Sequence, residues 1–220
     1  MYHWLVIGCV WTVLSGCASY VKGVGDVVAV MRASSNDKTI NERLDPRFSY
    51  LRIGVGKRFT FLVLGYVDPS QQGPIEIWYG AGGEVLRLQN SRVLGTAGMP
   101  VDWSNVRLSA NLAWADSKAD FSYSRTRDVM PGYDYGIVDT LSVTPIAPPK
   151  KSALAKVSSS SLSWYEERSS GIRHLPPARY AVSHVDGHAL VTYGEQCLSE
   201  SFCLSWQRWF PPTDGQNHAN

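Results

Sequence analysis

The feature that most constrains the fold is a pair of alternating apolar segments near the C-terminus, joined by two turn residues. Tyr180 to Val185 and His188 to Tyr193 are rich in aromatic and β-branched residues. Between them stands Asp186-Gly187, a sequence preferred in type I′ turns, which join antiparallel strands directly. The segment is therefore predicted to be a β-hairpin. Its expected register pairs Tyr180 with Tyr193, Val182 with Val191 and Val185 with His188.

Short segments of the same character recur along the chain and are separated by residues that favour turns. The sequence contains 19 Gly and 12 Pro, together with 8 Trp, 11 Tyr and 6 Phe. These proportions are typical of strands joined by tight turns. We expect a mainly β fold, either an antiparallel β-sandwich or a partly open barrel, preceded by a short helix over Ala18 to Arg32. The other expected strands are Phe48 to Val55, Arg58 to Tyr66, Ile75 to Tyr79, Glu84 to Leu88, Val93 to Thr96 and Phe121 to Arg127.

Alternation along the third and fourth of these strands predicts one apolar and one polar face. The apolar face would carry Ile75, Ile77 and Tyr79 with Leu86 and Leu88. The other face would carry Glu76, Trp78 and Arg87, so that an indole lies beside a guanidinium on a solvated surface. Because packing does not require a Trp on a polar face, these three residues form a first candidate patch for ligand contact.

The N-terminus has the pattern of an export signal. Residues 1–16 contain no Asp, Glu, Lys or Arg, and Trp4 to Leu14 form an apolar run that is too short to span a bilayer. Leu14-Ser15-Gly16-Cys17 then looks like a bacterial lipobox, with Cys17 as the lipidation site. The n-region lacks Lys and Arg, which departs from the usual pattern of a signal peptide. The alternative is a buried first strand with an incidental cysteine.

Acylation of Cys17 would attach the protein to a membrane without a transmembrane helix, because each buried acyl methylene contributes about 0.8 kcal/mol. Ala18 stands where an inner-membrane retention signal usually places Asp. We therefore expect the periplasmic side of the outer membrane. The expected organisation is a signal peptide over 1–16, an anchor with a short helix or linker over 17–44, and one β-rich domain over 45–220.

The cysteines support an oxidising compartment. With Cys9 in the signal and Cys17 acylated, Cys197 and Cys203 are left as a pair, and we expect them to form a disulfide. Two thiols without a second ligand pair do not make a metal site, and His184 and His188 fall on opposite faces of the predicted hairpin. The formal net charge is +2 and no basic run exceeds two residues, so no nucleic-acid partner is expected.

Several segments of the mature chain, in their order, resemble the YjbF/GfcB family of outer-membrane lipoproteins, which occur in operons for exopolysaccharide and group 4 capsule secretion. Those segments are Asp45-Pro46-Arg47, Trp78-Tyr79, Gly82 to Leu88, Gly95-Thr96-Ala97-Gly98, Asp102-Trp103, Met130-Pro131-Gly132-Tyr133 and Tyr135-Gly136.

The resemblance implies an accessory, non-catalytic component of polysaccharide secretion or assembly with an antiparallel β-rich fold. It brings no catalytic residues and no cofactor. The expected partners are the membrane, the polysaccharide and other secretion proteins of the same operon. Trp103, Tyr133 and Tyr135 form a second candidate patch for glycan contact, because aromatic rings stack on the C–H faces of sugars.

Two other functions remain open at this point. A glycan-modifying enzyme would need paired acids, but the adjacent Glu166 and Glu167 point to opposite faces of a strand. Asp116 and Asp120 are the other acids available, and the chain has no Gly-x-Ser-x-Gly, phosphate-loop or His-Glu-x-x-His motif. A β fold that encloses a lipid is the second alternative, since the strand from Phe59 to Leu64 is apolar on both faces and could line a cavity.

Overall fold

The computed structural model describes residues 44–110, 114, 120–185 and 187–210. This part of the chain forms a single sheet of twelve antiparallel strands. It also contains one short 3-10 helix, η2 (Ser159–Ser161). The strands are β1 (Tyr50–Val55), β2 (Arg58–Asp68), β3 (Ile75–Gly80), β4 (Val85–Gln89), β5 (Arg92–Ala97), β6 (Asp102–Leu108), β7 (Phe121–Met130), β8 (Asp134–Ile146), β9 (Ser163–Gly171), β10 (Ala178–Val185), β11 (His188–Cys197) and β12 (Cys203–Trp209).

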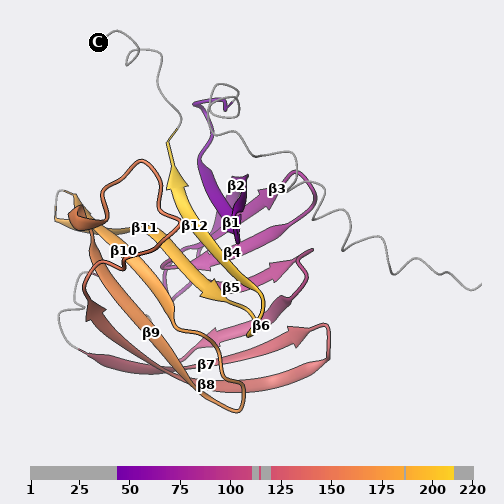
Figure 1. Ribbon diagram of the computed structural model, residues 1–220. Helices are drawn as coiled ribbons and strands as arrows, with labels where there is room; N and C mark the ends of the chain where they lie inside the picture. The colour runs from indigo at the N-terminus through magenta and orange to yellow at the C-terminus, as the bar shows by residue number, and fades with distance from the viewer. Residues whose placement is uncertain (1–43, 111–113, 115–119, 186, 211–220) are drawn as a thin grey trace, which may run out of the picture.

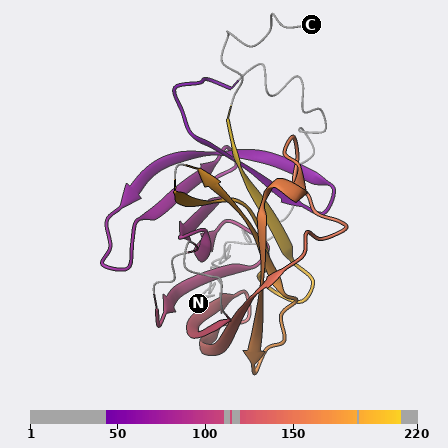
Figure 2. The same ribbon diagram turned by 90° about the vertical axis from the view of Figure 1, so that its left-hand side faces the viewer.

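Nearly every strand pairs with its neighbour in sequence, and β1 pairs with β12 in the middle of the sheet. The two edge strands, β5 and β6, follow each other along the chain and lie in contact. At this seam the backbone N–H of Trp103 donates to the Thr96 hydroxyl at 3.0 Å. The sheet therefore curls into a nearly closed barrel (Figures 1 and 2), which leaves little unpaired edge for other chains to add to.

Large side chains fill the middle of the barrel. On one side the interior is aliphatic, with Leu51, Leu62 and Leu86 buried almost completely. On the other side Trp103, Tyr123, Arg125 and Arg127 point inward among apolar neighbours. The packing of these side chains excludes water from both halves, so the polar groups among them require partners within the protein.

A second layer covers part of the outer face. The segment 147–158, between β8 and β9, crosses the outside of β11 and β12. There the Gln207 side chain exchanges two hydrogen bonds with the backbone of Ala155, at 2.8 and 2.9 Å, and the Tyr193 hydroxyl accepts from the N–H of Ala153. Burial of Tyr193 raises the pKa of its hydroxyl. These contacts fix the segment to the barrel wall.

The predicted β class is confirmed, and the barrel is the alternative that forms. The strand predicted from its two apolar faces is β2, which packs Leu62 inward and Phe61 outward against Tyr50 and Trp209. The predicted C-terminal hairpin is also present, with Val182 opposite Val191. Tyr180 pairs with Gly194 and not with Tyr193, because a β-bulge between Ala181 and Val182 inserts one residue.

Several predictions concern residues that the structure does not describe. The signal peptide over 1–16, Cys17 and the short helix expected over Ala18 to Arg32 all lie outside the described residues. Within the described ranges, no helix has the length and apolarity needed to cross a membrane.

Candidate functional site

A cavity of about 340 Å³ opens at one end of the barrel. Four connections surround it: the β5–β6 turn, the β7–β8 hairpin, the β9–β10 loop and the β11–β12 loop. Its volume is at the lower end of the range for small-molecule sites, roughly 300 to 1,000 Å³. The lining residues are Val101, Arg127, Val129, Pro131, Asp134, Ile137, Arg173, His174, Leu175, Leu198, Ser199, Glu200 and Ser201.

The charged residue deepest in this cavity is Arg127, which is 1% exposed. Its Nε donates to Asp139 Oδ2 at 2.7 Å, and Arg125 Nη2 donates to the same oxygen at 2.8 Å. The Trp103 ring lies 4.5 and 4.6 Å from the guanidinium carbons of Arg125 and Arg127, which places both cations over its face. One buried carboxylate, Asp139, thus faces two buried guanidinium groups, and the trio carries a net charge of +1.

A second buried ion pair, Arg92 with Glu167, lies on the same side of the barrel interior. Arg92 donates to Glu167 at 3.2 Å and to the Tyr123 hydroxyl at 2.7 Å. Burial opposes the charge on Arg92, but Tyr123 and Glu167 outweigh it and raise the pKa of the guanidinium. Burial, followed by the charge of Glu167, raises the pKa of the Tyr123 hydroxyl well above its usual value. Tyr123 therefore stays neutral.

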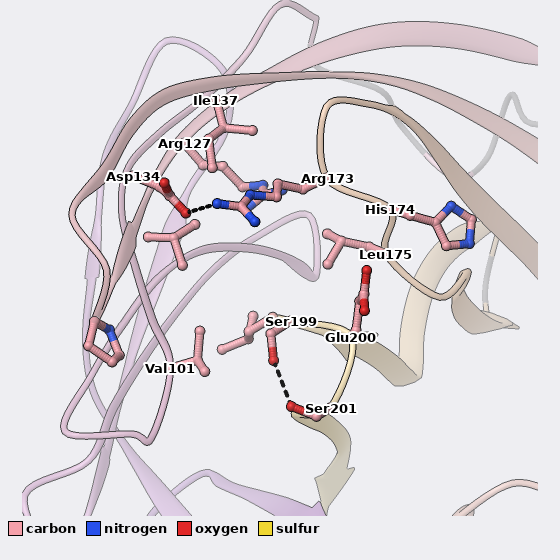
Figure 3. Close-up of a pocket in the computed structure, with 13 residues that line it drawn as sticks. Val101, Arg127, Asp134, Ile137, Arg173, His174, Leu175, Ser199, Glu200 and Ser201 are labelled. Atoms are coloured by element: carbon pink, nitrogen blue, oxygen red, sulfur yellow. Dashed lines mark hydrogen bonds and ion pairs between the residues drawn. The ribbon is translucent and has the colours of Figure 1, made fainter.

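The rim of the cavity is polar and more exposed. Arg173, in the β9–β10 loop, donates from Nη2 to Asp134 Oδ2 at 2.7 Å, and both side chains are more than a third exposed. Figure 3 shows the Arg173 side chain directed at Asp134, with Ser199 and Ser201 in the β11–β12 loop. The rim thus offers a guanidinium, hydroxyls and a carboxylate on loops from different parts of the sequence.

The walls of the cavity are held from outside. Asp128 accepts from Asn105 Nδ2 at 2.6 Å and from the backbone N–H of Gly136 at 2.7 Å, which fixes the β7–β8 hairpin. The Asn105 hydrogen bond, with that of Gly136, lowers the pKa of the Asp128 carboxyl. Cys197 and Cys203 are joined by a disulfide that closes the β11–β12 loop, so both predicted cysteines lie directly beside the residues that line this wall.

The first candidate patch does not form as the sequence predicted. In the observed register Tyr79 pairs with Val85 and Trp78 with Leu86, one residue away from the expected pairing. A shift of one residue moves a strand's side chains to the opposite face. Trp78 is therefore buried in the core at 1% exposure, and Arg87 lies on the other face of the sheet opposite Ile77.

The part of that patch that stays together lies at the opposite end of the barrel. Trp78 Nε1 donates to Glu76 at 3.2 Å, and Glu76 pairs with Arg208 at 2.7 Å. Trp78 and Arg208 contribute to a groove of about 390 Å³. Its other lining residues are Pro46, Phe48, Ser49, Tyr50, Leu190, Trp209 and Phe210.

The second candidate patch is divided between the core and the surface. Trp103 is fully buried, and its Nε1 donates to the Leu198 carbonyl at 2.9 Å. Tyr133 and Tyr135 are exposed, with ring centroids 6.5 Å apart, on the hairpin that also supplies Pro131 and Asp134 to the cavity. Trp103 therefore supports the cavity from beneath, and only the two tyrosines are free to touch a ligand directly.

The carboxylates considered for catalysis are separated as the strand alternation predicts. Glu166 lies outside in ion pairs with Arg168 and Arg179, whereas Glu167 lies inside with Arg92. Asp116 lies outside the described residues. Among residues 44–110, 114, 120–185 and 187–210, no cluster of three His, Cys, Asp or Glu side chains could hold a metal ion.

No sequence pattern indicates the cavity directly. Arg125 and Arg127 occupy alternate positions of a strand that was predicted correctly, so their common face could be predicted but not that it faces inward. Asp139 could not be assigned to them, because β8 was not predicted as a strand. The available signal was the spacing of the two arginines, which is typical of a solvated strand face as well.

The fold is similar to that of a protein of known structure. The crystal structure of the hypothetical lipoprotein YmcC from Escherichia coli K12 matches with a TM-score of 0.61, covering 84% of this chain and 97% of that chain. The sequence identity is 16%, so the likeness shows a shared fold and no more. No protein-family model matches the chain, and a search of curated proteins finds no match.

Proposed function

We propose that this chain is a periplasmic lipoprotein, anchored to the outer membrane through Cys17, and a non-catalytic accessory component of exopolysaccharide or capsule secretion. The observation that carries the proposal is a combination: a lipobox-like sequence precedes a barrel whose fold is shared with a protein described as a lipoprotein. The order of the family-like segments supports the link to polysaccharide. Acyl chains on Cys17 supply the membrane affinity.

The proposed non-catalytic role is supported by the ion pairs of two carboxylates, Asp139 beneath the cavity and Asp134 on its rim. Asp139 bonds two guanidinium groups and Asp134 bonds a third, so neither is placed as a free general base. Carriage of a lipid inside the barrel has less support, because Trp103, Arg125 and Arg127 occupy the interior beneath the cavity. A binding surface for glycan or for a partner protein at the barrel end agrees best with these features.

The test is palmitate incorporation and membrane fractionation of the wild-type protein and of Cys17→Ser, with extracellular polysaccharide measured in both strains and in a deletion strain. We expect Cys17-dependent labelling, outer-membrane fractionation and reduced polysaccharide in both mutant strains. Absence of label would overturn the anchor. Normal polysaccharide secretion in the deletion strain would overturn the secretion role.

A further inference from the structure

We propose that the cavity at the barrel end binds the carboxylate of an acidic sugar residue, with Arg127 and Arg173 as its ligands. The inference rests on the proposed function for its substrate class, a polysaccharide, and adds that the recognised unit is anionic. Within the proposed secretion role, this would make the barrel end the part of the protein that contacts the transported glycan.

Among the described residues below the cavity, two buried guanidinium groups share a single carboxylate. Arg125 and Arg127 share the carboxylate of Asp139, and all three side chains are at least nine-tenths buried. Asp139 is the partner of both cations: Arg127 bonds both of its oxygens, at 2.7 and 3.3 Å, and Arg125 bonds Oδ2. A ligand carboxylate that reaches Arg127 would add a second negative charge beside the two cations that share Asp139. The guanidinium group is suited to this task because it binds carboxylates through two parallel hydrogen bonds.

The rim of the cavity supplies a weakly paired guanidinium and several hydroxyl groups. Arg173 is 59% exposed and is paired with the partly exposed Asp134, so its ion pair is screened by water and is weak. A ligand carboxylate in the cavity can replace Asp134 as the partner of Arg173. Ser199, Ser201 and Glu200 supply groups that bond sugar hydroxyls, and Leu175 and Val101 supply apolar surface for the ring.

The cavity wall formed by the β11–β12 loop is held rigidly against the groups below it. The disulfide between Cys197 and Cys203 closes the loop that carries Ser199 to Ser201, and the carbonyl of Leu198 in that loop accepts from Trp103. Trp103 in turn stacks on Arg127. The hydroxyl-bearing wall and the guanidinium below it are therefore positioned by one connected set of contacts, which lowers the entropic cost of binding.

The experiment is isothermal titration of the full-length protein in detergent with tetragalacturonate and with its fully methyl-esterified form, which keeps the sugars and removes the charges. We expect tetragalacturonate to bind at least about tenfold more tightly, the effect of a charged hydrogen bond. Equal binding of the two compounds would overturn the proposal. Inorganic phosphate that competes at the same concentration as tetragalacturonate would also overturn it, because the site would then select any small anion.

Two variants and one control locate the site. Arg127→Met should weaken binding of tetragalacturonate at least about tenfold, and Arg173→Gln about fivefold, since its hydrogen bond is more exposed. Arg168→Gln is the matched control: Arg168 is 65% exposed and ion-paired with Glu166, but it lies on the outer face of the barrel. Its binding should equal that of the wild type. A loss in Arg168→Gln equal to that in Arg173→Gln would show a general charge effect and overturn the assignment.

The melting temperature of Arg127→Met distinguishes a binding role of Arg127 from a structural one. Because its removal leaves Arg125 and Asp139 as a neutral pair, Arg127→Met should melt at the wild-type temperature or above while binding is lost. A lower melting temperature with unchanged binding would overturn the proposal. Secretion by the deletion strain separates the two hypotheses: normal secretion refutes the proposed function whatever the titration gives, whereas reduced secretion with no binding preference refutes only the anionic ligand.

Discussion

The two sides of the barrel interior are built from different chemistry. On β1, β2 and β4 the inward residues include aliphatic side chains, and Leu51, Leu62 and Leu86 are at most 1% exposed. Where β7, β8 and β9 meet, the inward positions carry Arg125, Asp139 and Glu167, which are buried as deeply. Both sides belong to one sheet and to one continuous core.

The two kinds of interior contribute differently to the stability of the fold. Aliphatic burial stabilises the barrel by about 25 cal/mol for each Å² of apolar surface removed from water. Buried ion pairs seldom improve on well-packed apolar residues, because desolvation cancels much of their attraction. The aliphatic side is therefore explained by folding alone. The charged side is not, and it lies beneath the cavity.

The largest effect should come from removing the carboxylate that the charged side shares. Asp139→Asn leaves Arg125 and Arg127 buried without a counter-charge, so we expect a loss of roughly 3 to 5 kcal/mol in the free energy of unfolding. Urea denaturation measures it. The control is Asp134→Asn in the exposed pair with Arg173, which should cost less than about 1 kcal/mol. Equal losses in the two variants would show that burial does not increase the cost of removing the Asp139 charge.

On the aliphatic side, Leu62→Ala should cost about 3 kcal/mol, within the range of roughly 2 to 5 kcal/mol for a large-to-small change in a packed core. The loss arises from the methyl groups removed and from the cavity left behind. It should be independent of salt, and binding at the barrel end should be unchanged. If Leu62→Ala altered that binding, the two sides of the barrel would be coupled, and the aliphatic side would not serve folding alone.

Sequence patterns predicted the aliphatic side better than the charged one. β1, β2 and β10 are recognisable because their apolar residues are β-branched or aromatic and are bounded by turn residues. β8 was missed because Asp139 occupies an inward position, while Gly136 and Pro145 resemble turn residues. β6 is also hard to predict, because most of its residues are polar, and its pairing with β7 shifts between Ser104 and Arg107, where Asn105 has a positive φ of 50°.

The register of β3 and β4 could not be predicted because it depends on the turn between them. The N–H of Gly80 bonds the carbonyl of Glu84, and the N–H of Gly83 bonds the carbonyl of Gly80, so the turn is Ala81 to Gly83, three residues instead of the expected four. The resulting register places Trp78 on the same face as Leu86, in the core. The disulfide, in contrast, could be inferred from compartment and counting, because neither argument requires the register.

A third, smaller effect should come from the disulfide that closes the β11–β12 loop. The double variant Cys197→Ser, Cys203→Ser should lose about 2 kcal/mol, because the disulfide closes a short loop and restricts the unfolded chain only modestly. Thermal unfolding of the oxidised wild type and the variant measures the loss. Adding reductant should lower the melting temperature of the wild type toward that of the variant and leave the melting temperature of the variant unchanged. A reductant effect on the variant would place the cause outside this disulfide.

The smallest effect concerns Asp128, which fixes the β7–β8 hairpin on the charged side. Its pKa is lowered in the folded state by the Asn105 and Gly136 hydrogen bonds, compared with an unfolded value near 3.9. A carboxyl with a lowered folded pKa contributes stability above the unfolded pKa, and this contribution is lost as the pH falls through the folded pKa. The difference in urea midpoint between wild type and Asp128→Asn should therefore be full at pH 6 and shrink below about pH 4. Because every other carboxyl titrates in both proteins, the difference isolates Asp128, and a constant difference across this range would show that its hydrogen bonds do not depend on charge.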